Sequence, residues 1–232
     1  AWEICPGPAA CAQVRSDEAA PCNHRKGISL RIFGVILAGG ESRRMGREKA
    51  LVPLAGRPLL AHVLDRLDPQ VDRVLISANG DPTRFAAFGC PVIPDASPPG
   101  PPDARPQGPL SGILAALTHA AAQGATHLVS TPVDTPFLPG DLVPQLLLAA
   151  EASPHGLALA CDPTGDHPAT AVWPVTLIPA LTAFLQTGEA RVTRFADARQ
   201  AARARFPDPR AFVNLNTPED LAQAEALAKA AP

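Results

Sequence analysis

Residues 31–49 read RIFGVILAGGESRRMGREK, in which a short apolar run ends in paired glycines and is followed by four cations. The apolar run, Arg31–Leu37, is continuous rather than alternating, which is typical of a strand buried on both faces of a sheet. Paired glycines directly after such a strand let backbone N–H groups approach phosphate oxygens closely. The segment therefore predicts a phosphate-binding loop after the first strand of an α/β fold.

The cations of this loop, Arg43, Arg44, Arg47 and Lys49, suit a polyphosphate ligand. Two other phosphate loops are excluded by spacing, because the dinucleotide pattern G-x-G-x-x-G and the P-loop ending G-K-[ST] are both absent. Taken alone, the glycines and arginines also fit a tight turn beside a solvated basic loop. Because lysine is scarce in this arginine-rich chain, Lys49 is more informative than any single arginine.

Downstream of the loop, apolar runs alternate with helical patterns. The expected strands lie at 71–78, 91–93 and 126–131, and the expected helices at 59–67, 108–117 and 141–150. Such alternation implies a single doubly wound, mainly parallel sheet.

The C-terminal third continues in a different order. Strands are expected at 156–161, 169–173 and 201–206, a helix at 175–186, and a last helix beginning at Thr217-Pro218-Glu219-Asp220. Neither a linker nor an internal repeat divides the chain. We therefore expect one α/β domain over residues 30–232, preceded by a flexible extension over residues 1–29, which lack a pattern able to bury apolar surface.

Composition excludes several classes of protein. The chain has 232 residues, 46% of them hydrophobic, and a net charge of −2, so it has enough apolar residues for a core and no broad basic face for nucleic acid. The longest nearly apolar stretch, Ile32–Gly40, is about half of the ~18 residues needed to span a bilayer. No secretory signal is recognised, and five cysteines without a C-x-x-C pair indicate reduced thiols. We expect a cytoplasmic protein that binds neither nucleic acid nor membrane.

Polar residues follow three predicted strands at their carboxyl ends, where ligands bind in open α/β sheets. These residues are Asn79, Asp95 and Asp134. Because a hard divalent cation takes carboxylate and phosphate oxygens together, Asp134 is the candidate magnesium ligand. Each residue also fits a simpler role, Asp134 as a helix cap or turn residue and the other two as turn formers.

Several segments together resemble the GT-A-like α/β nucleotidyltransferases and, among these, the molybdenum cofactor guanylyltransferases. The segments are LAGGESRRMGREK at 37–49, LVPLAGRPLL at 51–60, GPLSG at 108–112, VDTPFLP at 133–139 and FVNLNTPEDL at 212–221. Asp166-His167-Pro168 matches the acceptor-side segment of the family, and the resemblance covers residues 31–228. It departs at Glu48, where the family usually has Asp, and in the proline-rich stretch 98–105.

The resemblance implies a Rossmann-like, GT-A-type fold and Mg²⁺-dependent transfer of GMP from GTP to the terminal phosphate of Mo-molybdopterin, with release of pyrophosphate. It also implies other molybdenum cofactor biosynthesis proteins and apo-molybdoenzymes as partners. It assigns nucleotide binding to Leu37, Ala38, Gly39, Gly40, Lys49, Asn79, Asp95 and Asp134. It assigns acceptor binding to Asp166, His167, Asn214 and Asn216.

The same resemblance gives three residues a catalytic role. No protein nucleophile is needed, because the acceptor phosphate attacks the α-phosphorus. Lys49 is expected on the α-phosphate, Arg44 on the leaving phosphates and Asp134 on the metal. His167 also fits a general base, although a histidine before proline at a strand start is more simply structural.

Three alternatives stay open: a cytidylyltransferase for the same pterin, a sugar-phosphate nucleotidyltransferase, and a nucleotide-binding module that has lost catalysis. Gly40 favours guanylyl transfer, because the cytidylyltransferases of the family tend to have alanine there. The ending N-x-N-T-P-E-D points the same way, and the presence of Lys49 and Asp134 disfavours a module without catalysis.

Overall fold

The computed structural model describes residues 30–39, 48–96 and 108–230. The expected extension over residues 1–29, the site residues Gly40 and Arg44, and the proline-rich stretch 98–105 lie outside the described residues. The strands are β1 (Ile32–Leu37), β2 (Pro53–Leu54), β3 (Arg57–Pro58), β4 (Arg73–Ser77), β5 (Val92–Ile93), β6 (His127–Pro132), β7 (Ala158–Asp162), β8 (Gly165–Pro174) and β9 (Ala202–Arg205).

The helices alternate with these strands in the first part of the chain and follow them in the last. The α-helices are α1 (Leu59–Leu67), α2 (Gly108–Ala122), α3 (Leu142–Ala150), α4 (Ile178–Gln186), α5 (Val192–Ala198) and α6 (Pro218–Ala230). The 3₁₀ turns are η1 (Lys49–Leu51), η2 (Asp68–Gln70), η3 (Pro82–Phe88), η4 (Val175–Leu177) and η5 (Pro209–Phe212).

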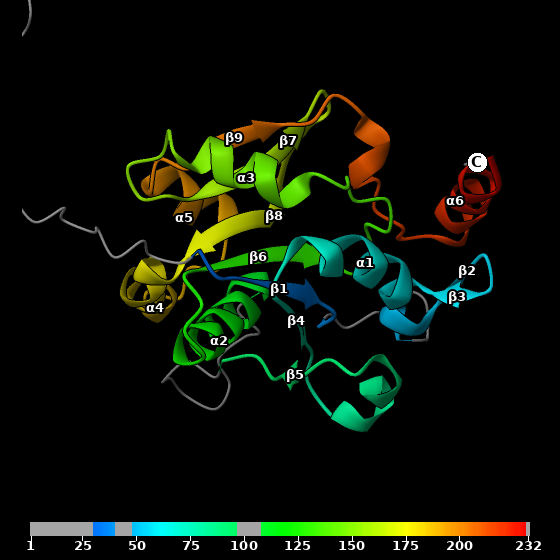
Figure 1. Ribbon diagram of the computed structural model, residues 1–232, viewed down its shortest axis with the longest axis horizontal. Helices are drawn as coiled ribbons and strands as arrows, with labels where there is room; N and C mark the ends of the chain where they lie inside the picture. The colour runs from blue at the N-terminus through cyan, green and yellow to red at the C-terminus, as the bar shows by residue number, and fades with distance from the viewer. Residues whose placement is uncertain (1–29, 40–47, 97–107, 231–232) are drawn as a thin grey trace, which may run out of the picture.

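Seven strands form one sheet in the order β5-β4-β1-β6-β8-β7-β9 (Figure 1). Among these strands only β8 runs antiparallel to its neighbours, so the expected doubly wound, mainly parallel sheet is confirmed. Leu37, the last residue of β1, aligns with Ser77 of β4 and Pro132 of β6. The carboxyl ends of three adjacent strands are therefore level, and the residues that follow them meet at one edge.

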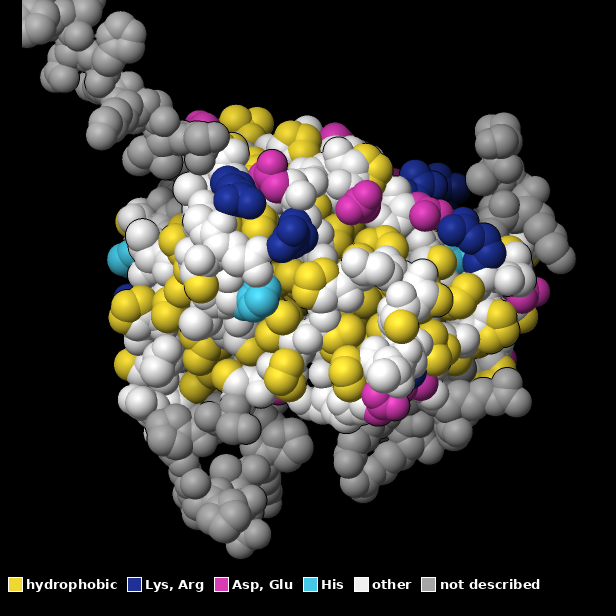
Figure 2. Space-filling view, turned by 60° about the horizontal axis from the view of Figure 1, so that its bottom comes forward, with side chains coloured by type: hydrophobic (Ala, Val, Ile, Leu, Met, Phe, Trp, Pro, Cys, Tyr) yellow, Lys and Arg dark blue, Asp and Glu magenta, His cyan; other side chains and the backbone are white. Residues whose placement is uncertain are grey.

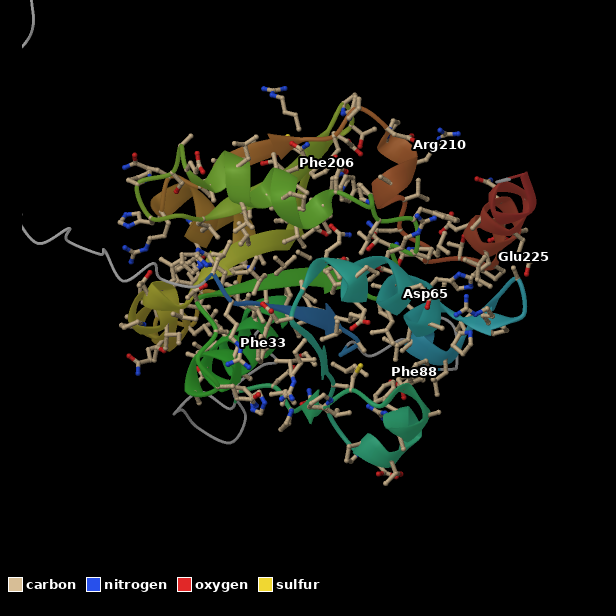
Figure 3. The ribbon with its side chains drawn as sticks, in the orientation of Figure 1. Phe33, Asp65, Phe88, Phe206, Arg210 and Glu225 are labelled. Carbon is tan, nitrogen blue, oxygen red and sulfur yellow. The ribbon has the colours of Figure 1, made fainter. Side chains whose placement is uncertain are left out.

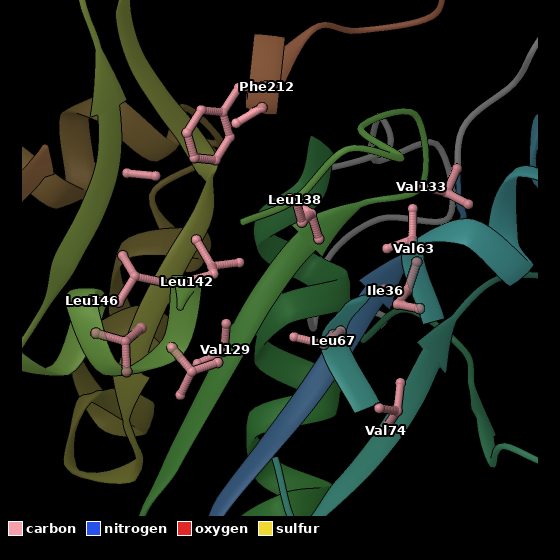
Figure 4. Close-up of a cluster of buried hydrophobic side chains, with 14 of the residues drawn as sticks. Ile36, Val63, Leu67, Val74, Val129, Val133, Leu138, Leu142, Leu146 and Phe212 are labelled. Atoms are coloured by element: carbon pink, nitrogen blue, oxygen red, sulfur yellow. The ribbon is translucent and has the colours of Figure 1, made fainter. Parts of the chain in front are cut away.

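Helices cover both faces of the sheet. On one face α1 packs against β1 and α3 packs against β7, β8 and β9. Figure 4 shows the apolar cluster under these helices, which includes Ile36, Val63, Leu67, Val74, Val129, Leu142 and Leu146. On the other face Leu117 of α2, Leu181 of α4 and Phe195 of α5 pack with Trp173. Trp173 is fully buried and donates its indole N–H to Ser130 Oγ at 2.9 Å, which satisfies its polar atom.

The C-terminal third differs from the expectation in three places. β8 begins at Gly165 rather than 169, and its register with β7 shifts between Leu159 and Ala160, so that residues 168–170 of β8 form a bulge without a partner on β7. The expected helix at 175–186 is divided into η4 and α4, with Pro179 in the first turn of α4. The short helix α5 was not expected, because seven residues are too few for a periodic apolar pattern.

The described surface carries mixed charge. On the face drawn in Figure 2, lysine and arginine side chains stand singly or in small groups beside acidic and apolar side chains. Within residues 30–39, 48–96 and 108–230, no helix has both the length and the apolar character needed to cross a membrane.

Gly112→Ala should lower the free energy of unfolding, although alanine is the better helix former by up to ~1 kcal/mol. A Cβ at this position of α2 would lie 2.3 Å from Ser77 Oγ and 2.9 Å from Asp95 Oδ1. Overpacking of this kind costs about 1–3 kcal/mol, which exceeds the gain in helix propensity. Denaturant unfolding measures the change, and Gly140→Ala is the matched control because nothing lies within 4 Å of its added Cβ. A Gly112→Ala protein as stable as wild type would contradict the close approach of α2 to β4.

Candidate active site

Lys49, Asp134 and Asn216 form a polar cluster beyond the carboxyl end of β6. The Lys49 ammonium lies 2.6 Å from Asp134 Oδ2 and 2.5 Å from Asn216 Oδ1. The two side chains of the ion pair are only 17% and 18% exposed, so solvent screens the pair less than a surface pair. The Leu215 N–H also donates to the Asp134 carbonyl at 3.0 Å. The cluster joins η1, the loop after β6 and the segment before α6.

The second carboxylate oxygen of Asp134 is the candidate metal ligand. Asp134 Oδ1 is buried and has no hydrogen-bond partner among the described residues, which is costly for a carboxylate oxygen unless a ligand satisfies it. The described residues contain no group of three or more histidine, cysteine, aspartate and glutamate side chains able to hold a metal. Mg²⁺ is commonly held by one or two carboxylates together with substrate phosphates and water. The donor set therefore fits a magnesium ion that is bound together with a phosphate ligand.

Ser77, Asn79 and Asp95 form a second cluster, where β4 and β5 end. Asp95 accepts hydrogen bonds from Ser77 Oγ and Asn79 Nδ2, both at 3.0 Å, and its own N–H donates to Asn79 Oδ1 at 3.0 Å. These bonds join two strand ends rather than closing a local turn. A Cβ added to Gly39 would lie 3.8 Å from both Asp95 carboxylate oxygens, so the first residue of the glycine pair lies beside this cluster.

The other described residues of the predicted nucleotide site lie between the two clusters. Leu37 ends β1, and Ala38 is buried and donates its N–H to the Ser77 carbonyl at 2.9 Å. The structure thus places Leu37, Ala38 and Gly39 beside the end of β4, which Asn79 follows by two residues. Their predicted contact with a nucleotide stays a prediction.

The residues predicted for the acceptor separate into two groups. Asn216 belongs to the Lys49 cluster, and Asn214 is exposed two residues before it. Asp166, at the start of β8, instead accepts from Arg203 Nε of β9 at 2.7 Å. The polar contact of Asp166 therefore lies within the sheet β7-β8-β9 and not in the Lys49 cluster, and its acceptor role stays a prediction.

His167 is held by an acidic and an aromatic neighbour. Its Nε2 lies 2.8 Å from Asp162 Oδ2, and its ring stacks on Phe212 with the ring centroids 4.5 Å apart. Burial disfavours the charged form of Asp162, but the hydrogen bonds from Thr164 and the contact with His167 outweigh it and lower the pKa of Asp162. These contacts agree with the structural role that the sequence left open for His167.

Asp220 fixes the segment that carries Asn216. One carboxylate oxygen of Asp220 accepts from the N–H groups of Asn216 at 2.9 Å and Thr217 at 2.8 Å. The Asp220 N–H donates in return to Thr217 Oγ1 at 3.1 Å, which completes a reciprocal cap at the start of α6. The hydrogen bonds from Asn216 and Thr217 lower the pKa of Asp220.

A cleft of about 1210 Å³ lies between α1 and η5 and is also lined by residues 136–141, which follow Asp134 in the chain. Figure 3 labels Asp65 on α1 and Arg210 on η5, which line it from opposite sides. Among the described residues, none of those predicted for the site lines this cleft. The volume of the cleft therefore does not identify the site, which is identified by the side chains at the strand ends.

Sequence reasoning missed two residues that shape the site, Ser77 and Gly112. Ser77 bonds Asp95, and Gly112 leaves room for both side chains. The available signals were a polar residue at the end of an apolar strand and a glycine inside an apolar helical stripe, which often marks a close packing contact.

The chain is similar to known proteins over most of its length. A family model described as "MobA-like NTP transferase domain" matches residues 34–204. A protein of Cereibacter sphaeroides named "Molybdenum cofactor guanylyltransferase" is 54% identical over 200 residues, which are 85% of this chain and 97% of that protein. A protein of Rhodobacter capsulatus with the same name is 50% identical over 196 residues, 84% of this chain and 96% of that protein.

A solved structure shares the fold. It is "Molybdopterin-guanine dinucleotide biosynthesis protein A" from Archaeoglobus fulgidus, and it matches with a TM-score of 0.64 over 86% of this chain and 100% of that chain. At 21% identity this likeness concerns the fold alone.

Lowering the pH should loosen the start of α6. A carboxylate whose pKa is lowered on folding contributes stability above its unfolded pKa, and that stability is lost as the pH falls through its folded pKa. The amide NMR signals of Asn216 and Thr217 should therefore shift together with an apparent pKa below the usual range of an aspartate. Glu219→Gln, a neighbouring change, should leave this titration in place. If the same titration persists in Asp220→Asn, Asp220 is not its source.

Proposed function

We propose that this chain, which belongs to the MobA-like NTP transferase family, is a molybdenum cofactor guanylyltransferase. It transfers GMP from GTP to the terminal phosphate of Mo-molybdopterin and releases pyrophosphate. The observation that carries the proposal is the Lys49–Asp134 ion pair beyond β6, with Asp134 Oδ1 buried and lacking a partner among the described residues. The names of the two relatives, each matched over nearly its whole length, support the choice of substrates.

The chain contributes charge and position rather than a nucleophile. An oxygen of the pterin phosphate attacks the α-phosphorus of GTP, and the bond from that phosphorus to the β-phosphate oxygen breaks, so pyrophosphate leaves. Catalysis of phosphoryl-type transfer depends mainly on alignment and on stabilising the charge that develops. Magnesium held at Asp134 supplies Lewis-acid neutralisation of phosphate charge when it is bound.

Lys49 provides the nearby cation. Its ammonium group is paired with Asp134 Oδ2 and donates a hydrogen bond to Asn216 Oδ1. When GTP binds, we infer that Lys49 exchanges the carboxylate oxygen for an oxygen of the α-phosphate. Asn216 keeps its contact during this exchange, because its backbone is fixed by Asp220. The lysine therefore reaches the phosphate from a position that is already ordered.

Asn79 and Asp95 are assigned to the nucleoside. Their reciprocal bonds fix both side chains before a ligand arrives, so little conformational freedom remains to be lost on binding. Gly39 has no side chain, which leaves the space beside Asp95 open to a ligand.

The proposal also specifies GTP, rather than another nucleoside triphosphate, as the nucleotide substrate. Thermal shift with GTP, CTP, ATP and UTP, each with Mg²⁺, tests it, and we expect GTP to raise the melting temperature most. A larger rise with CTP would favour the cytidylyltransferase. A rise with GTP but no release of pyrophosphate would favour the module without catalysis.

The cytoplasmic location stays a prediction. The interactions with other molybdenum cofactor biosynthesis proteins and with apo-molybdoenzymes also stay predictions.

Asp134→Asn should abolish transfer while the protein remains folded. The amide keeps the shape of the side chain and the Leu215 N–H bond to the backbone, but it lacks the anionic oxygen that a hard cation requires. The measurement is pyrophosphate release as a function of Mg²⁺ concentration, with circular dichroism to check folding. Asp65→Asn is the control, because it makes the same change in an exposed ion pair with Arg57. Activity within about tenfold of wild type, with ordinary Mg²⁺ dependence, would contradict the metal assignment.

Lys49→Ala should slow transfer far more than it weakens GTP binding. A cation on the α-phosphate matters most in the transition state, where charge builds up, and loss of one such preorganised group costs about 10²–10³ in rate. Lys49→Arg should restore only part of the rate, since the planar guanidinium is longer and directs its donors differently. Calorimetry of GTP–Mg²⁺ binding and single-turnover transfer separate the two effects. Equal losses in affinity and rate would make Lys49 a uniform binding residue.

A further inference from the structure

Arg84, on η3, connects the two clusters of the site. Its Nη1 lies 3.1 Å from Glu48 Oε2, and its Nη2 donates to the Asn79 carbonyl. Glu48 directly precedes Lys49, and the Asn79 side chain holds Asp95. The Arg84 guanidinium therefore connects Glu48, which precedes Lys49, to Asn79, which holds Asp95.

The local sequence holds this arginine in place. Gly80 has φ +85°, a conformation that glycine adopts at little cost, and a Cβ added there would lie 3.4 Å from Arg84 Nη1. Asp81 caps η3 by accepting from the Thr83 N–H at 2.9 Å and from Thr83 Oγ1 at 2.7 Å. The guanidinium carbon also lies 4.9 Å from the ring centroid of the fully buried Phe85. The two terminal nitrogens of Arg84 and the face of its guanidinium therefore have partners, whereas its buried Nε has no hydrogen-bond partner among the described residues.

The ion pair between Arg84 and Glu48 is less exposed to solvent than an ordinary surface pair. The Arg84 and Glu48 side chains are 31% and 25% exposed, whereas Arg194 and Glu189 of another pair are 64% and 39% exposed. Exposed ion pairs contribute little to stability, because solvent screens their charges.

We propose that Arg84 is a positioning residue for the transfer reaction, which binds Glu48 and the Asn79 carbonyl and thereby fixes Lys49 relative to the Asn79–Asp95 pair. This inference rests on the function proposed above. Transfer requires the lysine and the α-phosphate to be aligned, and a displacement of about 1 Å costs on the order of 10² in rate. Arg84 acts through the side chain of Glu48 and the backbone carbonyl of Asn79, and its charge is paired with the Glu48 carboxylate.

The test is a double-mutant cycle on transfer, with Arg84→Met, Glu48→Gln and the double variant. Each single change should lower kcat about tenfold or more, with little change in the KM for GTP, because alignment rather than binding is lost. The double variant should be no slower than the slower single variant, because both changes break one connection. Arg84→Lys should restore little, since an ammonium does not reproduce the two-directional guanidinium contact. Arg194→Met, which breaks the exposed pair with Glu189, should leave kcat unchanged.

A second readout does not depend on the reaction. The amides of Leu51 and Val52 donate to the Glu48 and Lys49 carbonyls at 3.0 and 3.1 Å. Their hydrogen exchange should be faster in Arg84→Met and in Glu48→Gln at an unchanged melting temperature. If GTP is not the substrate, this readout still applies, so failure of the proposed function is distinguished from failure of the positioning role.

Three results would overturn the proposal. The first is a folded Arg84→Met protein with wild-type kcat and wild-type exchange. The second is additive losses in the double variant, which would show that the two side chains act independently. The third is a loss of GTP affinity in Arg84→Met that Glu48→Gln does not share, which would show that Arg84 binds the phosphates directly. Should Arg84→Met fail to fold, Glu48→Gln and Arg84→Lys decide by the same criteria.

Discussion

The ion pair between Lys49 and Asp134 is the interaction on which the arrangement of the site depends. It is mostly buried, and removal of one partner from such a pair leaves the other charge uncompensated. The pair joins the end of the glycine-rich segment to the loop after β6, and Asn216 adds the segment before α6. Three parts of the chain thus meet at the Lys49 ammonium group, which binds a phosphate of the nucleotide in the proposed reaction.

The sheet makes this meeting possible. Because β1 lies between β4 and β6 with all three carboxyl ends level, Gly39 follows β1 between the two polar clusters. The close approach of α2 through Gly112 sets the position of Ser77 and Asp95 on one side. Arg84 then connects that side to the residue preceding Lys49. Helix packing, strand register and hydrogen bonding therefore together fix the positions of the two polar clusters relative to each other.

The sequence predicted the elements of the fold better than it predicted the contacts between their side chains. The strand before the glycines, the carboxylates at strand ends and the capped start of α6 are local patterns, and the structure contains all three. The pairing of Lys49 with Asp134 joins residues 85 positions apart, so no local pattern reveals it. For the same reason Arg84 passed unnoticed as one of many arginines, although its contact with Glu48 lies within the site. Asp166 and His167 likewise contact residues of neighbouring strands, and His167 also contacts Phe212. The tertiary fold brings these residues together, so the local sequence does not reveal the contacts.

The measurement that tests the account most directly is phosphorus NMR of the purified chain with Mo-molybdopterin, Mg²⁺ and either GTP or CTP. The account predicts that GTP is consumed while pyrophosphate and a pterin–guanine dinucleotide appear in equal amounts, and that this stops when Mg²⁺ is left out. Turnover with CTP instead of GTP would contradict the guanylyl assignment. No pyrophosphate with either nucleotide, from a folded protein that binds GTP, would contradict the claim that the Lys49–Asp134 cluster catalyses transfer.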